Sequence, residues 1–452
     1  MSENLCSVGL DVGTTTTQLI VSRIKIQNRA SGFAVPSMEI TEREIVYESP
    51  VQFTPLRDTQ NVDGEKLQQM VAAEYRRAGI RPENVDTGAI IITGETSRKE
   101  NARAVLDALS GYAGEFVVAT AGPDLESVLA ARGAGAAEWS EKTGKTVLHM
   151  DIGGGTSNLA RIEDGKIVAT YCMNVGGRLL KFKEGRITYI SPVLRDITDL
   201  REGDTPTREA LDFIADMLTQ VLEMAAGLRK KTELFQKLAT REVTGTWDCK
   251  PGAVLSFSGG VADCIEQQHP DFAFGDMGPI LGQAIRRSLL CRGEYMLGRQ
   301  TIRATVIGAG CYSTQLSGST VFYRDIKLPL KNLPVAAFDL RQQEDPECIR
   351  RRLLREDADT VVIALPGYFS PTYHQVRQLA EVLSQVKEKK LLVALQADMA
   401  KALGHSLCLM LPPGTPCLCI DRVQLEEGSY LDIGLPVGPC LPVVIKTLIL
   451  SL

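Results

Sequence analysis

The stretch that most constrains the fold of this chain is residues 149–158, which read H-M-D-I-G-G-G-T-S-N. An apolar lead precedes it, so the pattern predicts a strand that ends in a glycine-rich turn. Without Cβ atoms, such a turn can bring backbone N–H groups close to an anion, and hydroxyl residues add further donors. Asp151 lies just before the turn, where a carboxylate can hold a divalent cation against phosphates. The predicted nucleotide-binding residues of this turn are Gly153, Gly154, Gly155 and Thr156.

A second copy of the pattern lies near the N-terminus, where residues 9–17 read G-L-D-V-G-T-T-T-T. Apolar residues again lead into an aspartate, Asp11, followed by a glycine and a run of threonines. Two such strand–turn units in one chain indicate a duplicated fold. A cleft between the two halves would hold one polyphosphate and its metal from both sides. The predicted nucleotide-binding residues of this turn are Gly13, Thr14, Thr15 and Thr16.

Composition indicates an ordinary globular protein. The 452 residues are 44% hydrophobic and 23% charged, with a net charge of −5, and this length predicts roughly two to four domains. The acidic balance argues against nucleic acid as the main partner, because phosphate neutralisation needs many Lys and Arg side chains. The sequence shows no secretion signal and no apolar run of membrane-spanning length. We therefore expect a cytoplasmic protein without a membrane or nucleic-acid partner.

The expected elements repeat along the chain. Three strands, a helix, a strand, a helix, a strand and a helix fill residues 5–135, and the same order begins again at Thr146. The apolar spacing predicts a helix over residues 64–78 that ends at Gly79, and Asp164-Gly165 predicts a hairpin turn. A further helix is expected to begin at Thr205-Pro206. Residues 303–307 are predicted as a strand.

Together with S-G-G-V at residues 258–261, these features resemble the actin-like ATPase superfamily. The resemblance implies an α/β fold with two ribonuclease-H-like lobes around a nucleotide cleft that binds ATP and Mg²⁺. It implies a first lobe over residues 1–140, a second over 141–318 with a helical insertion at about 178–250, and a C-terminal mixed α/β domain over 319–452.

The superfamily resemblance also implies roles for particular residues. Asp11 and Asp151 would hold the metal and take part in catalysis. Glu95 and Glu126 are the candidates for orienting the hydrolytic water, and the sequence leaves open which of them does so. The adenosine motif would be Ser258, Gly259, Gly260 and Val261.

Motifs spread over essentially the whole chain are similar to those of the ethanolamine ammonia-lyase reactivating factors. Among them are A-I-I-I-T-G-E-T at residues 89–96, N-V-G-G-R-L at 174–179 and E-E-G-S-Y-L-D-I-G-L-P from residue 426. This resemblance implies a chaperone-like ATPase that releases damaged cobalamin from ethanolamine ammonia-lyase so that adenosylcobalamin can rebind. The expected partner is the lyase, cobalamin is handled through it, and association with an ethanolamine bacterial microcompartment is a further expectation.

Three other functions stay open at this stage. A small-molecule kinase of the same fold would need a carboxylate base beside a substrate hydroxyl. A filament or scaffold protein would use the nucleotide to govern assembly. An iron–sulfur activator of acyl-CoA dehydratases would need cluster ligands near the hinge, and the surroundings of Cys172 and Cys311 lack that pattern.

Overall fold

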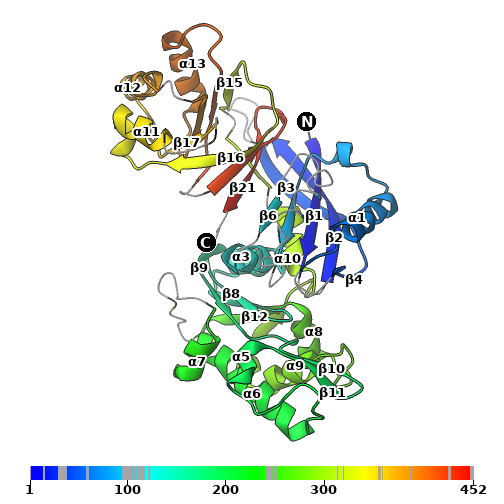
Figure 1. Cartoon of the computed structure of the whole chain (residues 1–452). Helices are drawn as coiled ribbons and strands as arrows, with labels where there is room; N and C mark the ends of the chain where they lie inside the picture. The colour runs from blue at the N-terminus through cyan, green and yellow to red at the C-terminus, as the bar shows by residue number, and fades with distance from the viewer. Residues whose placement is uncertain are drawn as a thin grey trace.

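The computed structural model describes most of the chain (Figure 1). The described residues are 2–13, 16–28, 38–57, 61–93, 105, 109, 118–120, 123–240, 247, 252–312, 314–318, 320–354, 358, 360–386, 389–425 and 429–447.

The first lobe is built on a mixed sheet with the strand order β3-β2-β1-β5-β6. The first three strands form an antiparallel meander, and the last two join β1 in parallel. The strands are β1 (Ser2–Val12), β2 (Thr16–Asn28), β3 (Met38–Glu48), β5 (Thr87–Ile92) and β6 (Val118–Thr120), with the short β4 (Gln52–Phe53) paired to β2.

Helix α1 (Gly64–Ala78) covers one face of this sheet, as the sequence predicts. Its N-cap Asp63 accepts a hydrogen bond from the backbone N–H of Lys66, and Gly79 ends it in the left-handed conformation with φ 68°. The helix buries Leu67 and Val71 against the sheet. A short 3₁₀ turn, η1 (Pro82–Asn84), then leads into β5.

The second lobe repeats the sheet of the first. Its strand order is β9-β8-β7-β12-β13, again an antiparallel meander followed by two parallel strands. The strands are β7 (Val147–Ile152), β8 (Ser157–Glu163), β9 (Lys166–Met173), β12 (Val254–Ser258) and β13 (Tyr295–Leu297). The predicted hairpin turn is confirmed, because Asp164 and Gly165 both have positive φ, 48° and 75°.

The shared order, three antiparallel strands followed by two parallel ones, is that of a ribonuclease-H-like sheet. Two such sheets in one chain confirm the predicted fold class, an actin-like ATPase fold with a further α/β domain at the C-terminal end.

Between β9 and β12 the second lobe carries a hairpin and helices, and two further helices follow β12. They are β10 (Leu180–Lys183), β11 (Arg186–Ile190), α5 (Pro192–Arg195), α6 (Arg208–Ala225), α7 (Glu233–Leu238), α8 (Gly260–Glu266), α9 (Gly278–Arg287) and the 3₁₀ turn η4 (Leu289–Cys291). The N-cap of α6 is Thr207, whose side chain accepts from Ala210 N, and not Thr205 as the sequence predicts. The helix is thus capped by Thr207, which follows the Thr205-Pro206 pair.

Two helices cross between the lobes (Figure 1). Helix α3 (Pro123–Gly133), followed by α4 (Ala136–Thr143), touches the first sheet through Leu129 and the second through Ala131. It packs against α10 (Ala304–Ile307) and the π-helical turn η5 (Gly308–Tyr312). A Cβ on Gly133 would lie 1.9 Å from the carbonyl oxygen of Ala304, and one on Gly308 would lie 2.1 Å from that of Leu129. Glycine is therefore needed on both sides of the crossing.

The prediction of a strand at residues 303–307 is wrong, because α10 occupies this segment. Its β-branched residues favour a strand locally. The close contact with α3 instead requires a compact helical backbone at this place.

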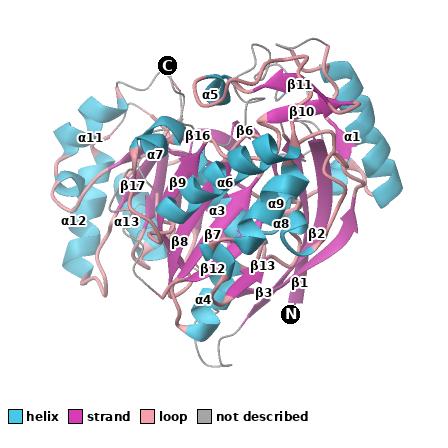
Figure 2. Ribbon diagram, turned by 90° about the horizontal axis from the view of Figure 1, so that it is seen from below, coloured by secondary structure: helices cyan, strands magenta, loops and turns pink. Residues whose placement is uncertain are grey.

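The C-terminal domain has its own eight-stranded sheet, with the order β14-β21-β20-β16-β17-β18-β19-β15. Its strands are β14 (Thr314–Leu316), β15 (Phe322–Arg324), β16 (Leu330–Ala337), β17 (Val362–Leu365), β18 (Leu391–Leu395), β19 (Cys417–Ile420), β20 (Ser429–Ile433) and β21 (Pro442–Thr447). Strands β16 to β19 run parallel. Helices α11 (Pro346–Leu353), α12 (Tyr373–Ser384) and α13 (Ala400–Met410) connect them and gather on one side (Figure 2).

This C-terminal domain is fixed to the first lobe. Val437 packs with Leu5, Ile24 and Ile26, and the Thr87 and Thr314 hydroxyls lie 2.6 Å apart in a buried hydrogen bond. Figure 1 shows the C-terminal domain beside the first sheet, at the opposite end of the molecule from the second lobe.

Candidate functional site in the cleft between the lobes

The two predicted turns have the same geometry. Gly13 N donates to Thr16 O at 2.9 Å, and Gly153 N donates to Thr156 O at 2.9 Å. Each glycine follows an aspartate by two residues. In the hairpins, Asp11 lies opposite Gln18 and Asp151 opposite Asn158. The duplication expected from the sequence is therefore present in the backbone itself.

The two turns differ in how closely other atoms approach their glycines. A Cβ on Gly155 would meet no atom within 4 Å, so a ligand can approach this backbone closely. A Cβ on Gly13 would lie 3.0 Å from Thr16 O, a tight contact to which this turn would have to adjust. Thr16 itself begins β2 and pairs with Phe53. Thr14 and Thr15 lie outside the described residues.

Three carboxylates from different elements meet between the turns. Asp11 is the second-last residue of β1, Asp151 is the second-last residue of β7, and Glu126 lies on α3. Asp11 and Glu126 keep part of their surface accessible, whereas Asp151 is 6% exposed. The structure thus brings together three of the four acids that the sequence singles out. The fourth, Glu95, lies outside the described residues.

The electrostatics of these acids show how close they are. Burial raises the pKa of Asp11 to about 7, with the Asp151 carboxylate adding to the shift and Thr93 opposing it. Burial raises the pKa of Asp151 to about 6 against hydrogen bonds from Ser258 and Thr305. The pKa of Glu126 is raised well above its ordinary value by burial and by both aspartates. A nearby cation would restore the charged forms.

A buried hydrogen-bond chain supports Asp151 from behind. The Ser258 hydroxyl donates to Asp151 Oδ1, so its oxygen accepts from His149 Nε2 at 2.9 Å. The other ring nitrogen, Nδ1, then accepts from the Ser256 hydroxyl at 3.0 Å. Burial lowers the pKa of His149 to about 3, which keeps this ring neutral. The chain fixes the orientation of one Asp151 oxygen.

Asp11 has a simpler support. The Thr93 hydroxyl donates to its Oδ1 at 2.8 Å. Sequence reasoning did not assign roles to Thr93, Asn158 or Thr305, although Thr93 opens the T-G-E-T run and Asn158 closes the second glycine-rich stretch. Their places in these motifs could have pointed to Thr93 and Asn158 as site residues. No neighbouring motif points to Thr305.

The predicted adenosine motif lies at the end of β12 and the start of α8. Gly259 has φ 86°, and a Cβ there would lie 2.3 Å from Ile152 O. This glycine is therefore required for packing against the end of β7. The side chain of Ser258 faces Asp151, Gly260 opens α8, and Val261 is buried.

The acids of the cleft fit one hydrated divalent cation. Among the described residues, no group of three or more acidic, His or Cys side chains could hold a metal ion by itself. Two aspartates from opposite lobes, which already accept hydrogen bonds from nearby hydroxyls, leave most ligand positions to phosphate oxygens and water. Mg²⁺ at nucleotide sites is usually bound in this way.

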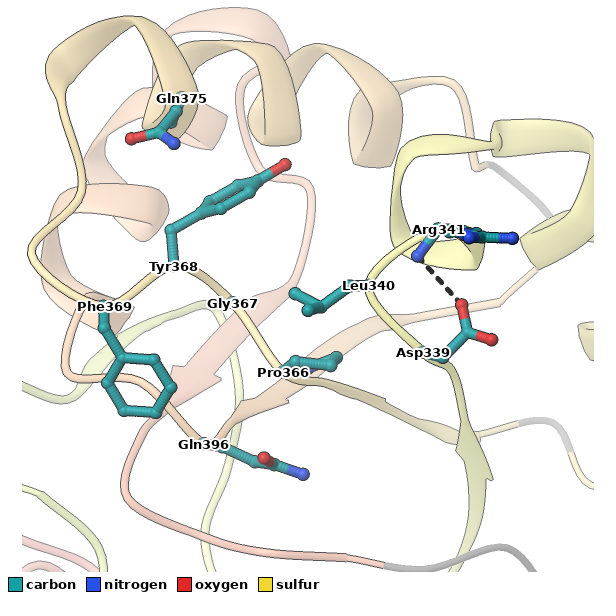
Figure 3. A pocket seen from close by; sticks show the side chains of 9 residues that line it. All are labelled: Asp339, Leu340, Arg341, Pro366, Gly367, Tyr368, Phe369, Gln375 and Gln396. Atoms are coloured by element: carbon teal, nitrogen blue, oxygen red, sulfur yellow. Dashed lines mark hydrogen bonds between the residues drawn. The ribbon is translucent and has the colours of Figure 1, made fainter.

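A separate hollow of about 700 Å³ lies on the C-terminal domain (Figure 3). The loops that follow β16, β17 and β18 form it, with Leu340, Tyr368 and Phe369 as apolar walls and Gln375 and Gln396 as amide groups. Asp339 accepts from the backbone N–H of Arg341 at its edge. The hollow is far along the chain from both turns.

No helix in the described ranges is long and apolar enough to cross a membrane.

Comparisons with known proteins give a consistent result. The family model described as "Ethanolamine utilisation protein EutA" matches residues 3–451. The ethanolamine ammonia-lyase reactivase EutA of Salmonella typhimurium is 40% identical, with 99% of each chain covered. The Escherichia coli protein of the same name is 38% identical, again with 99% of each chain covered. Among solved structures, the Aquifex aeolicus PPX-GPPA enzyme is 13% identical with a TM-score of 0.42, covering 68% of this chain and 99% of that one.

Proposed function

The chain belongs to the EutA family of ethanolamine utilisation proteins, and from this membership we propose that it is an ATP-dependent reactivase of ethanolamine ammonia-lyase. Both curated relatives carry that reactivase name and match over nearly their full length. The observation that carries the ATP part of the proposal is the pair of matching Asp-Gly turns with Asp11, Asp151 and Glu126 between them.

In this proposal the two turns bind the phosphates of ATP. Backbone N–H groups near Gly155 approach the polyphosphate, and Asp11 and Asp151 hold Mg²⁺ or its water ligands from opposite sides. Bound Mg²⁺ supplies positive charge that offsets the phosphate oxygens during phosphoryl transfer. The hydrogen bonds that link Ser256, His149 and Ser258 keep the Asp151 carboxylate in one orientation.

We assign the orientation of the hydrolytic water to Glu126. Its carboxylate faces both aspartates, receives a hydrogen bond from Asn158 and remains partly accessible. A cation bound between the aspartates would counter this raised pKa and favour the charged carboxylate, which can accept a proton from water. Glu95 stays the alternative acid for this role, as predicted from the sequence.

Hydrolysis would be coupled to the lyase by movement of the lobes. The crossing of α3 and α10 is the natural hinge, and the C-terminal domain is attached to the first lobe. ATP can help to open the lyase only if the lyase binds the open and closed forms with different affinity. Closure would then release damaged cobalamin, which the chain handles through the lyase.

The experiment measures release of hydroxocobalamin from inactivated ethanolamine ammonia-lyase, with and without Mg-ATP. The wild type is compared with Asp11→Ala, Asp151→Ala and the control Asp199→Ala, an exposed aspartate in the loop after α5. The proposal expects ATP-dependent release that both cleft variants lose and the control keeps. Equal release without ATP, or no release by the wild type, would overturn it.

Location is a further part of the proposal. We expect the protein in the cytoplasm, associated with the ethanolamine microcompartment. Fractionation of cells grown on ethanolamine, with the lyase as a marker, tests this.

A further inference from the structure

The N-V-G-G-R-L segment at residues 174–179 lies directly against the second glycine-rich turn. Gly177 N donates to Gly153 O at 3.0 Å, and Arg178 N donates to Gly154 O at 2.6 Å. A Cβ on Gly176 would lie 2.3 Å from Gly154 O, so the two backbones touch. The glycines of this motif are thus explained by close packing onto the turn.

The same segment reaches the rest of the predicted nucleotide site. A Cβ on Gly177 would lie 2.9 Å from Gly278 Cα and 3.1 Å from a methyl group of Val261, in the predicted adenosine motif. Met277 N donates to Gly177 O at 2.9 Å. The segment therefore connects the turn, the adenosine motif and the start of α9.

Arg178 is held rigidly in this position. Its side-chain stem lies along Gly154, with Cδ 3.3 Å from the place a Cβ would take. Its Nε donates to Asp276 Oδ2 at 2.8 Å. Asp276 is 5% exposed, and its other oxygen accepts from Gly278 N at 2.8 Å, at the first residue of α9. A buried carboxylate thus fixes one edge of the guanidinium.

The other edge of the guanidinium remains available. Within the described residues, Nη1 and Nη2 of Arg178 donate to no protein acceptor, and the side chain is 22% exposed. An arginine held at Nε can still present its two terminal nitrogens to an anion in a fork geometry.

The acidic side chains near the turn favour a cationic side chain such as Arg178. Burial is the first cause of the raised pKa of Asp11, Asp151 and Glu126, and the charges of neighbouring aspartates add to the shifts of Asp11 and Glu126, so these acids lie close together. A polyphosphate would add several negative charges. Mg²⁺ offsets part of this repulsion, and a fixed arginine beside the turn would offset more.

We propose that Arg178 is a phosphate-binding residue of the cleft, and that Asp276 is its positioning residue. This inference rests on the proposed nucleotide site and adds the cation that the sequence motifs did not assign. The ligand it recognises is the polyphosphate of the nucleotide, not the adenosine.

Binding measurements on the full-length chain test the role of Arg178. Calorimetry gives the affinity for Mg-ATP and Mg-ADP, and saturation-transfer NMR follows adenosine. Loss of a charge-assisted hydrogen bond predicts about 10- to 100-fold weaker binding of both nucleotides by Arg178→Ala. Adenosine binding should not change. Arg186→Ala, in an exposed position of the β11 hairpin, is the control and should bind as the wild type.

Two further measurements separate a phosphate contact from a structural role. Added guanidinium ion should partly restore nucleotide binding to Arg178→Ala, which a packing defect would not allow. Asp276→Asn alone should weaken nucleotide binding. The same substitution added to Arg178→Ala should have little further effect, because both residues act through one contact.

The outcomes are distinguishable. A wild type that binds no ATP would overturn the proposed nucleotide site together with this inference. A wild type that binds ATP and an Arg178→Ala variant of equal affinity would overturn the inference alone. Equal loss of ATP and adenosine by that variant would also overturn it, because the effect would then be structural.

Discussion

Asp11 and Asp151 occupy equivalent positions in the two lobes, each two residues before a glycine whose N–H bonds to a threonine carbonyl three residues further on. They lie close enough for the charge of Asp151 to raise the pKa of Asp11. Two copies of one local structure therefore face each other across the cleft. From this pairing and its surroundings, four predictions follow in addition to the tests above.

The first prediction concerns pH. Burial raises the pKa of Asp11 to about 7, whereas an aspartate in the unfolded chain titrates near 4. Between these values the folded protein holds more protons than the unfolded chain, so the free energy of unfolding falls as pH rises. Asp11→Asn should show a smaller fall between about pH 4 and pH 7, measured by urea unfolding without Mg²⁺. Asp199→Asn is the control, and an unchanged slope in Asp11→Asn would contradict the raised pKa.

The second prediction concerns the Ser258 hydroxyl. Ser258→Ala leaves Asp151 Oδ1 without this donor, so the pKa of Asp151 should rise and Mg-ATP should bind about tenfold more weakly at neutral pH. Ser256→Ala is a matched control, since Ser256 bonds His149 but not Asp151. Calorimetric titration of both variants decides. An equal loss in the two would show that the His149 chain acts as a whole and not through Ser258.

The third prediction concerns the crossing of α3 and α10. Gly133→Ala places a methyl group where Ala304 O now lies, so the helices must separate. We expect a loss of about 1–3 kcal/mol in the free energy of unfolding, as for other overpacked sites. Gly293→Ala should be nearly neutral, because a Cβ there meets no atom within 4 Å. Thermal unfolding of both variants measures the difference, and similar values for the two would count against a tight crossing.

The fourth prediction concerns which domains move relative to each other. Fluorescent labels at exposed Phe213 in the second lobe and Leu409 in the C-terminal domain should change their separation when Mg-ATP binds. Labels at Arg76 in α1 and Leu409 should keep theirs, because the C-terminal domain packs on the first lobe. Energy transfer in both pairs measures the movement. A changed distance in the second pair, or an unchanged distance in the first, would contradict the proposed movement of the lobes.

Much of the local structure was predictable from the sequence. The helix over residues 64–78 follows from apolar spacing and a left-handed glycine, and the Asp164-Gly165 turn follows from residues that tolerate positive φ. Both glycine-rich turns were predictable because the strand, the aspartate and the glycine are neighbours in the chain. In each case the cause lies within a few residues.

Other features depend on contacts that the sequence order hides. Residues 303–307 have strand-forming side chains but form α10, because this segment must pack against Gly133. Gly259 is needed because Ile152 O lies where a side chain would be. Neither reason can be inferred from neighbouring residues.

The two glycine-rich turns, the aspartates that precede them and the family membership of the chain are encoded in short contiguous motifs, so they could be predicted from the order of residues. Which groups meet between the lobes depends on the fold. Glu126 reaches both aspartates from α3, and Arg178 meets an aspartate 98 residues away. Charge, burial and hydrogen bonding act over a few ångströms in space, whatever the separation along the chain.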